Sequence, residues 1–344
     1  MNSKIQSIPP TQPPAPRIWT SLDLIKWTSE FFKKKGIESA RLEAELLLAE
    51  VLGVPRIRLY VDFDKAVPQE KLAAYREFVK RRAETREPIQ HIIGHAHFID
   101  LKLKVSRAVL IPRPETELLA LWAVDCFKPP PVDNPPAEAP LEPVPETLPP
   151  EANAAEPPVV PPKESAAPIR VLDLCTGSGC LALYVASKLT HAAVVATDLS
   201  AEALAVAAEN AGSLALDSRV GFKHGDLFGA LAAEEKHSFD LLIANPPYID
   251  PAARATLQPE VRDHEPDNAL FADEAGLNLL RRIIEAAPEW LKRGGWMGLE
   301  FGIAQAEALT AMATATGAYS EIKIKEDHRR LPRFLLARCK STAL

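Results

Sequence analysis

The alternation of apolar strands and helices from residue 169 onward constrains the fold more than any other feature of the sequence. Four apolar runs have the length and composition of buried strands, namely 169–173, 193–198, 239–244 and 298–301. Helices are predicted between them, one from Leu181 and another that Ser200 can cap. Repeated strand–helix units predict a mainly parallel sheet with helices on both faces, which is the α/β class.

The residues before this region predict a small helical bundle over 18–90. Helices with one apolar face are expected to end at Gly36 and Gly53, and a third is expected to begin after Pro68. Exposed basic residues in this bundle are interpreted as solvated faces.

A β-hairpin and a connecting helix are predicted over 91–127. Apolar residues from Phe98 to Val105 alternate with lysines, which indicates a strand, and Val109–Ile111 is its expected hairpin partner. Glu115 and Glu117 are acids suited to the first turn of the helix that follows.

Proline marks two segments that are not expected to fold. Twenty of the 32 prolines lie in residues 1–17 and 128–168, and the second segment contains neither glycine nor an aromatic residue. A segment with so little apolar surface cannot offset the entropy lost on ordering. We therefore expect a disordered tail over 1–17 and a disordered insert over 128–168, with a separate folded domain over 169–344.

The folded parts carry little net charge, which restricts the class of partner. The chain has a net charge of -6, and seven acids and two lysines give 128–168 a net charge of -5, which leaves -1 for the rest. Long duplex nucleic acid requires a clustered basic face, so it is not an expected partner. The sequence contains no run of 18 apolar residues, so no membrane span is predicted. The four cysteines form no CxxC pair, which fits a reducing cytoplasm.

A glycine-containing turn, DLCTGSG at residues 173–179, joins a predicted strand to a predicted helix. Glycines at such a turn let a ligand approach the backbone, and the helix N-terminus offers free N–H groups. Asp198 ends the next strand, where its carboxylate can accept hydrogen bonds from both hydroxyls of a ribose. The turn lacks the GxGxxG and GK[ST] patterns, which disfavours NAD and the phosphates of ATP.

A second motif, Asn245-Pro246-Pro247-Tyr248, directly follows the predicted strand 239–244. The prolines fix two φ angles, so we expect a rigid loop at the carboxyl end of a strand, where open α/β sheets bind ligands. Its carbonyls and the Asn245 side-chain oxygen suit a planar NH2 group, and the Tyr248 ring can stack on an amide or a base. The motif is typical of methyltransferases that alkylate a nitrogen conjugated to a π-system. Exocyclic base amines and the glutamine amide both satisfy that description.

Eight segments over nearly the whole folded sequence occur in a fixed order. They are REPIQHIIGHAHFIDLKLKV, LIPRPETELL, LDLCTGSG, TDLS, NPPYI, EPDNAL, GL and LEFG. In this the chain resembles the HemK/PrmC family, the glutamine methyltransferases of peptide-chain release factors. IPRPETE, at residues 111–117, is the most specific segment, because the sister enzymes for ribosomal protein L3 share NPPY but differ there.

The resemblance implies that residues 169–344 are the catalytic domain of a class I methyltransferase that uses S-adenosyl-L-methionine, with a Rossmann-like, mainly parallel seven-stranded sheet. The helical domain would help to dock the release factor, and N5-methylation would fall on the glutamine of its Gly-Gly-Gln motif. The implied catalytic and substrate-binding residues are Asn245, Pro246, Pro247 and Tyr248. The implied cofactor contacts are Asp173, Cys175, Thr176, Gly177, Ser178, Gly179, Asp198, Asp226, Leu227 and Asn245. The chain departs from the superfamily pattern DxGxGxG at Cys175, which replaces the first glycine, and the family does not need an insert as long as 128–168.

Three alternatives stay open: methylation of another protein glutamine of the ribosomal protein L3 type, N6-adenine methylation of nucleic acid, and a non-catalytic partner-binding scaffold. A monomer is expected. No metal site is predicted, because His91, His95 and His97 lack acidic or cysteine companions at ligand spacing. Arg113, Glu115 and Glu117 are interpreted either as the lining of the site or as caps and charge pairs.

Overall fold

The computed structural model describes residues 18–128 and 168–341. The predicted tail 1–17 and almost all of the predicted insert lie outside the described residues. The described chain divides into two compact units. One unit, here called the helical unit, contains the residues up to His95 together with Leu257–His264, and the other, the sheet unit, contains 96–256 and the residues from Glu265 onward.

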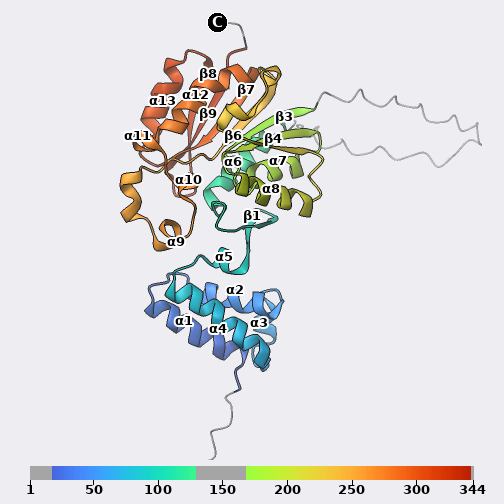
Figure 1. Ribbon diagram of the computed structural model, residues 1–344, viewed down its shortest axis with the longest axis vertical. Helices are drawn as coiled ribbons and strands as arrows, with labels where there is room; N and C mark the ends of the chain where they lie inside the picture. Colours follow the sequence, from blue (N-terminus) through green and yellow to red (C-terminus); the bar gives the residue numbers. More distant parts are fainter. Residues whose placement is uncertain (1–17, 129–167, 342–344) are drawn as a thin grey trace, which may run out of the picture. The chain divides into compact units, whose positions relative to one another are not determined.

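The helical unit is a bundle of antiparallel helices and single helical turns (Figure 1). Its helices are α1 Ser21–Lys34, α2 Ala40–Leu52, α3 Arg58–Val61, α4 Gln69–Glu84, α5 Ile89–Ile93 and α9 Pro259–Arg262. Gly36 and Gly53 have φ angles of 71° and 70°, so they end α1 and α2 in the left-handed conformation, as predicted. The core packs Phe32, Leu47 and Tyr75, which are all nearly inaccessible to solvent.

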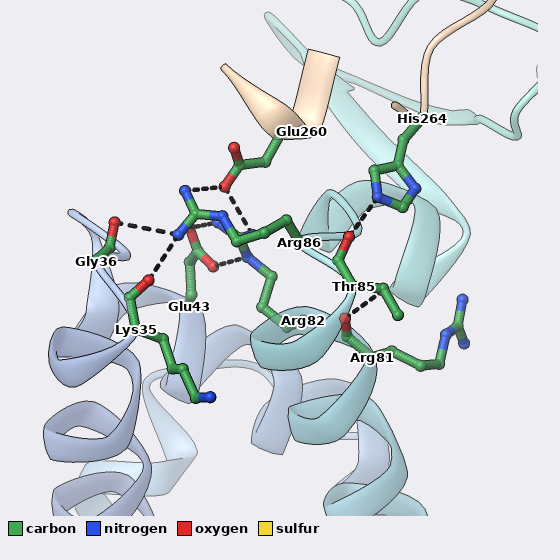
Figure 2. A network of polar contacts seen from close by, with 9 residues as sticks. All are labelled: Lys35, Gly36, Glu43, Arg81, Arg82, Thr85, Arg86, Glu260 and His264. Atoms are coloured by element: carbon green, nitrogen blue, oxygen red, sulfur yellow. Dashed lines mark hydrogen bonds and ion pairs between the residues drawn. The ribbon is translucent and has the colours of Figure 1, made fainter. Parts of the chain in front are cut away.

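An ion-pair network centred on the buried Arg82 fastens the segment 257–264 to the helices of this unit (Figure 2). The Arg82 guanidinium donates to Glu43 from Nη2 at 3.1 Å and to Glu260 from Nη1 at 2.8 Å. The Arg86 guanidinium lies 2.6 Å from the same Glu260 carboxylate. We call Glu43, Arg82, Arg86 and Glu260 the Arg82 network. It brings together side chains from α2, α4 and a segment that follows them by more than 170 residues.

The sheet unit is built on a seven-stranded sheet with the order β5-β4-β3-β6-β7-β9-β8. Its strands are β3 Ile169–Leu174, β4 Ala192–Asp198, β5 Val220–His224, β6 Phe239–Ala244, β7 Leu291–Glu300, β8 Tyr319–Glu326 and β9 Pro332–Cys339. The five strands from β5 to β7 pair in parallel, and β9 runs antiparallel to both of its neighbours. The predicted mainly parallel seven-stranded sheet is confirmed.

Alternate residues of the central strands enter two separate cores, which is why helices cover both faces (Figure 1). Val171 joins the core beneath α6 and α7, whereas Leu172 joins the core beneath α12 and α13. The helices of the unit are α6 Pro114–Asp125, α7 Cys180–Lys188, α8 Ala201–Ser213, α10 Asp267–Leu270, α11 Asp273–Gly276, α12 Asn278–Trp290 and α13 Ala306–Ala315, with 3-10 turns η1 Leu227–Ala230, η2 Ala233–Glu235 and η3 Pro251–Thr256. No helix among the described residues is long and apolar enough to cross a bilayer.

The hairpin is formed by the segments before and after residues 99–100, not by the predicted pairing of Phe98–Val105 with Val109–Ile111. Strand β1, His95–Phe98, pairs with β2, Leu101–Lys104, and Ile99 takes a left-handed φ of 55° in the turn between them. The expectation that Val109–Ile111 forms the second strand is therefore wrong. Those residues are apolar because Val109 and Ile111 pack against α8 rather than because they belong to a sheet.

Candidate active site

The turn between β3 and α7 has left-handed backbone at three alternate positions. Cys175, Gly177 and Gly179 have φ angles of 57°, 54° and 83°. These are the three glycine positions of the DxGxGxG pattern, and glycine suits them because each requires a left-handed φ. Cys175 adopts this φ although it has a side chain. A non-glycine residue pays about 1 kcal/mol for this conformation.

Asp173 holds this turn from beneath. Its Oδ2 accepts hydrogen bonds from the Thr176 hydroxyl at 2.6 Å and from the Ala182 N–H at 3.1 Å. Burial raises the pKa of Asp173 to about 7, although both hydrogen bonds oppose the shift. The residue shapes the turn and does not itself line the cavity described below.

Asp198 ends β4 beside the turn. Its Oδ2 accepts from the Gly177 N–H and its Oδ1 accepts from the Ser200 N–H, both at 2.9 Å. Burial raises the pKa of Asp198, and these N–H groups act against that shift. Each carboxylate oxygen has a second lone pair, so the fixed carboxylate can still accept from a ligand hydroxyl. The predicted cap is confirmed, since the Ser200 hydroxyl accepts from the Ala203 N–H at 3.1 Å.

A cavity of about 100 Å³ opens above the turn. Nine of the predicted site residues line it: Cys175, Thr176, Gly177, Ser178, Asp198, Asp226, Leu227, Asn245 and Pro247. Four others, namely Asp173, Gly179, Pro246 and Tyr248, lie outside the lining. Thr197 also lines the cavity, and its buried hydroxyl has no hydrogen-bond partner among the described residues. That orphaned hydroxyl and the fixed Asp198 carboxylate suit a polar, hydroxyl-bearing ligand.

The loop Asn245–Tyr248 leaves β6 next to the end of β7. The parallel register pairs Ala244 with Leu299, which brings Asn245 beside Glu300. The Asn245 Nδ2 donates to the Thr116 hydroxyl at 3.1 Å, and that hydroxyl donates to Glu300 Oε2 at 2.7 Å. The Tyr248 hydroxyl donates to Glu300 Oε1 at 3.2 Å. The buried Glu300 carboxylate therefore holds both ends of the loop, Tyr248 directly and Asn245 through Thr116.

The far side of this loop packs against two glycine-containing segments. A Cβ atom at Gly276 would lie only 2.0 Å from the Tyr248 carbonyl oxygen, so no larger residue fits there. The Gln305 Nε2 donates to the same carbonyl at 3.0 Å. Ile249 continues the loop with a hydrogen bond from its N–H to Leu270 at 3.0 Å. The loop is therefore rigid because of its neighbours as well as its prolines.

Three functional-site residues, Thr116, Glu300 and Gln305, were not assigned a role from the sequence. Thr116 and Glu300 stand in the segments IPRPETE and LEFG, so the motifs located them without indicating what they contact. Arg113 both lines the cavity and pairs with Glu265 at 2.8 Å, which combines the two interpretations that the sequence left open.

Comparison with known proteins agrees with this geometry. The family model described as the PrmC N-terminal domain matches residues 23–94, and the methyltransferase small domain matches residues 162–260. The release factor glutamine methyltransferase of Geobacter sulfurreducens is 40% identical, over 88% of this chain and 91% of its own length. The enzymes of the same name from Rhodopirellula baltica and Chlorobaculum tepidum are both 35% identical, over 91% and 94% of this chain and 95% and 98% of their own lengths.

The chain belongs to the release factor glutamine methyltransferase family. The match to the PrmC N-terminal domain falls on the helical unit, and the methyltransferase match contains the turn, Asp198 and the Asn245–Tyr248 loop. The resemblance inferred from the sequence motifs is thereby confirmed, as is the methyltransferase class.

Proposed function

We propose that this protein N5-methylates the glutamine side-chain amide in the Gly-Gly-Gln motif of class 1 peptide-chain release factors. The observation that carries the proposal is the Asn245 side chain at the cavity wall, with its NH2 end tied to Thr116 and its oxygen left for another donor. A primary amide presents the planar NH2 group that such an acceptor can bind. The names of the relatives support release factors as the substrate.

The residues of the cavity fit S-adenosyl-L-methionine, which when bound supplies an electrophilic methyl group on a sulfonium. Asp198 would accept the ribose hydroxyls, and the left-handed turn at Cys175–Ser178 would let the backbone approach the cofactor. Asp226 and Leu227 line the same cavity and would lie beside the adenine. These assignments, and those of Asp173 and Gly179 to the support of the turn, remain proposals that binding measurements can test.

Asn245 would act on the nitrogen that is methylated. An amide nitrogen is a poor nucleophile because its lone pair is delocalised into the carbonyl. The Asn245 side-chain oxygen and the carbonyls of Asn245 and Pro246 would accept hydrogen bonds from this NH2 group as it becomes tetrahedral, which stabilises the transition state more than the planar ground state. Tyr248 and Pro247 would hold the amide plane. No strong base is needed, because an alkylated amide is acidic and releases its proton readily.

The test is transfer of a labelled methyl group from S-adenosyl-L-methionine to purified release factor, compared with a release factor whose Gly-Gly-Gln glutamine is replaced by alanine. We expect label only in the former. Asn245→Ala should reduce turnover by at least about 100-fold while leaving cofactor binding within about threefold, because the acceptor acts mainly in the transition state. Asn278→Ala, at the surface on α12, is the matched control and should keep wild-type turnover.

The same assay separates the alternatives. Label in ribosomal protein L3 or in adenine-containing nucleic acid, with none in release factor, would replace the proposal by one of the other two methyltransferase functions. Absence of label in all three would favour a non-catalytic scaffold. A monomer in a reducing cytoplasm completes the proposal, in keeping with four free thiols at Cys126, Cys175, Cys180 and Cys339.

A further inference from the structure

The buried carboxyl group of Glu300 is the centre of the polar contacts behind the substrate loop. Only 1% of Glu300 is exposed, and Thr116 is equally buried. Glu300 accepts from Thr116 on one oxygen and from Tyr248 on the other. We call Thr116, Asn245, Tyr248 and Glu300 the Glu300 network. All of its members belong to the sheet unit. Asn245 and Tyr248 also belong to the proposed substrate loop, whereas Thr116 and Glu300 do not.

The direction of each hydrogen bond in this network follows from the chemistry of its groups. An ionised carboxylate can only accept, so the single hydroxyl proton of Thr116 is committed to Glu300. The Thr116 oxygen is then an acceptor toward Asn245, and only the NH2 end of the Asn245 amide can face it. While Glu300 is ionised, the Asn245 oxygen therefore points to the other side.

The direction of the Thr116 and Asn245 hydrogen bonds depends on whether Glu300 is ionised, and its surroundings affect that ionisation. Burial raises the pKa of Glu300 to about 7, against the hydrogen bond from Thr116, the nearby Arg333 and the Tyr248 hydroxyl, while Glu115 raises it further. Arg333 is itself buried and donates to the Phe301 carbonyl at 3.2 Å. Arg113 also acts on the Tyr248 hydroxyl and opposes the rise in its pKa.

We propose that Thr116 and Glu300 are positioning residues that fix the Asn245 amide with its oxygen toward the substrate NH2 group. This proposal rests on the proposed function for the identity of the substrate, and its geometry rests on the Thr116 and Glu300 contacts alone. If the amide were turned over, its NH2 group would face the substrate NH2 group, and two donors repel each other. Thr116 and Glu300 thus determine whether the Asn245 amide presents an acceptor or a donor to the substrate, without contacting the substrate themselves.

Variants at Thr116 test the proposal. Thr116→Val keeps the shape of the side chain but removes both hydrogen bonds, so kcat for release factor should fall by about 10- to 100-fold, with KM and cofactor affinity changed less than about threefold. Thr116→Ser retains the hydroxyl and should return kcat to within about threefold of wild type. Thr314→Val, an exposed hydroxyl on α13, is the control for threonine loss and should have no effect.

A second measurement does not depend on turnover. The side-chain NH2 signal of Asn245 in nitrogen-15 NMR is identified by its absence in Asn245→Asp. In wild type and Thr116→Ser we expect one of its two protons to exchange slowly with solvent, and in Thr116→Val we expect this protection to be lost.

Each outcome decides the question. Wild-type kcat in Thr116→Val, or equal damage in Thr116→Ser and Thr116→Val, would overturn the positioning role, as would an Asn245 signal that Thr116→Val leaves unchanged. If the wild-type protein fails to methylate release factor, the proposed function fails, and the NMR comparison still decides whether Thr116 fixes the amide.

Discussion

The Arg82 network and the Glu300 network each contain a carboxyl group that is largely shielded from solvent. Their surroundings shift the pKa of Glu260 and of Glu300 in opposite directions. Burial alone would raise the pKa of Glu260, but its own backbone N–H and the guanidinium groups of Arg82 and Arg86 outweigh that effect and lower it. Glu300 is hydrogen-bonded by two hydroxyls, and burial prevails, which raises its pKa to about 7. The two guanidinium groups therefore favour the ionised form of Glu260, whereas the hydroxyl donors leave Glu300 close to its titration point.

The comparison teaches what each network can do. A carboxylate whose pKa is lowered by two guanidinium groups stays ionised down to a lower pH, and over that range it holds two parts of the chain together. This suits the attachment of segment 257–264. A carboxylate with neutral donors directs hydrogen bonds without a strong field, and this suits the orientation of a catalytic amide. The difference is open to the following tests.

The largest stability effect should come from Arg82→Met. This change leaves the largely covered Glu43 carboxylate without its guanidinium partner and removes one of the two guanidinium groups that bind Glu260, so the helical unit should lose about 3 kcal/mol. Urea denaturation followed by hydrogen exchange of α2 and α4 measures the loss.

Lys33→Met is the matched control for that experiment. Lys33 pairs with Glu30 at 2.8 Å, and more than 60% of each side chain is exposed, so the loss of stability should be far smaller than in Arg82→Met. Similar losses in the two variants would show that the Arg82 network contributes no more than a surface ion pair.

The next effect is a pH dependence of opposite sign at the two carboxyl groups. The folded pKa of Glu300 lies above its ordinary value of 4.5, so the unfolded chain releases this proton first and stability falls as pH rises from about 4.5 to 7. Compared with Glu300→Gln, wild type should therefore lose up to about 1.4 kcal/mol per pH unit across this range.

Glu260→Gln provides the contrast. The folded pKa of Glu260 is lowered, so its contribution is present above pH 4.5 and should disappear as pH falls through the folded pKa. Thermal or urea unfolding of wild type and both variants between about pH 2 and pH 8 measures the two slopes. Slopes of the same sign would remove the distinction between the networks.

The smallest effect concerns the strained turn. Cys175→Gly and Cys175→Ala both remove the thiol, but only glycine relieves the left-handed φ of 57°. The glycine variant should be more stable than the alanine variant by about 1 kcal/mol. Urea midpoints of the two proteins give the difference, and an alanine variant of equal or greater stability would show that the turn relaxes to another conformation.

The sequence predicted the features that neighbouring residues encode. The strands 239–244 and 169–173, the Ser200 cap, the helix ends at Gly36 and Gly53 and the loop at Asn245–Tyr248 all follow from local patterns, and the structure has each of them. The hairpin prediction failed because an apolar triplet has the same pattern whether it pairs with a strand or packs on a helix.

The contacts that orient the site could not be predicted in this way. Thr116 and Glu300 are 184 residues apart, and Asn245 and Thr116 are 129 residues apart, so their meeting depends on the order of β6 and β7 in the sheet and on the placement of α6. The attachment of Glu260 to Arg82 spans 178 residues and is likewise a property of the whole fold.

The inclusion of segment 257–264 in the helical unit has a consequence for how this protein can change through recombination. The chain passes between the two units three times, after His95, before Leu257 and after His264. A single genetic crossover near residue 95 would bring in a new set of helices while keeping the old Glu260, which would then meet an unmatched surface. Exchange of the helical unit between relatives must therefore carry two separate stretches of the gene, and substitutions at positions 43, 82, 86 and 260 should be inherited together.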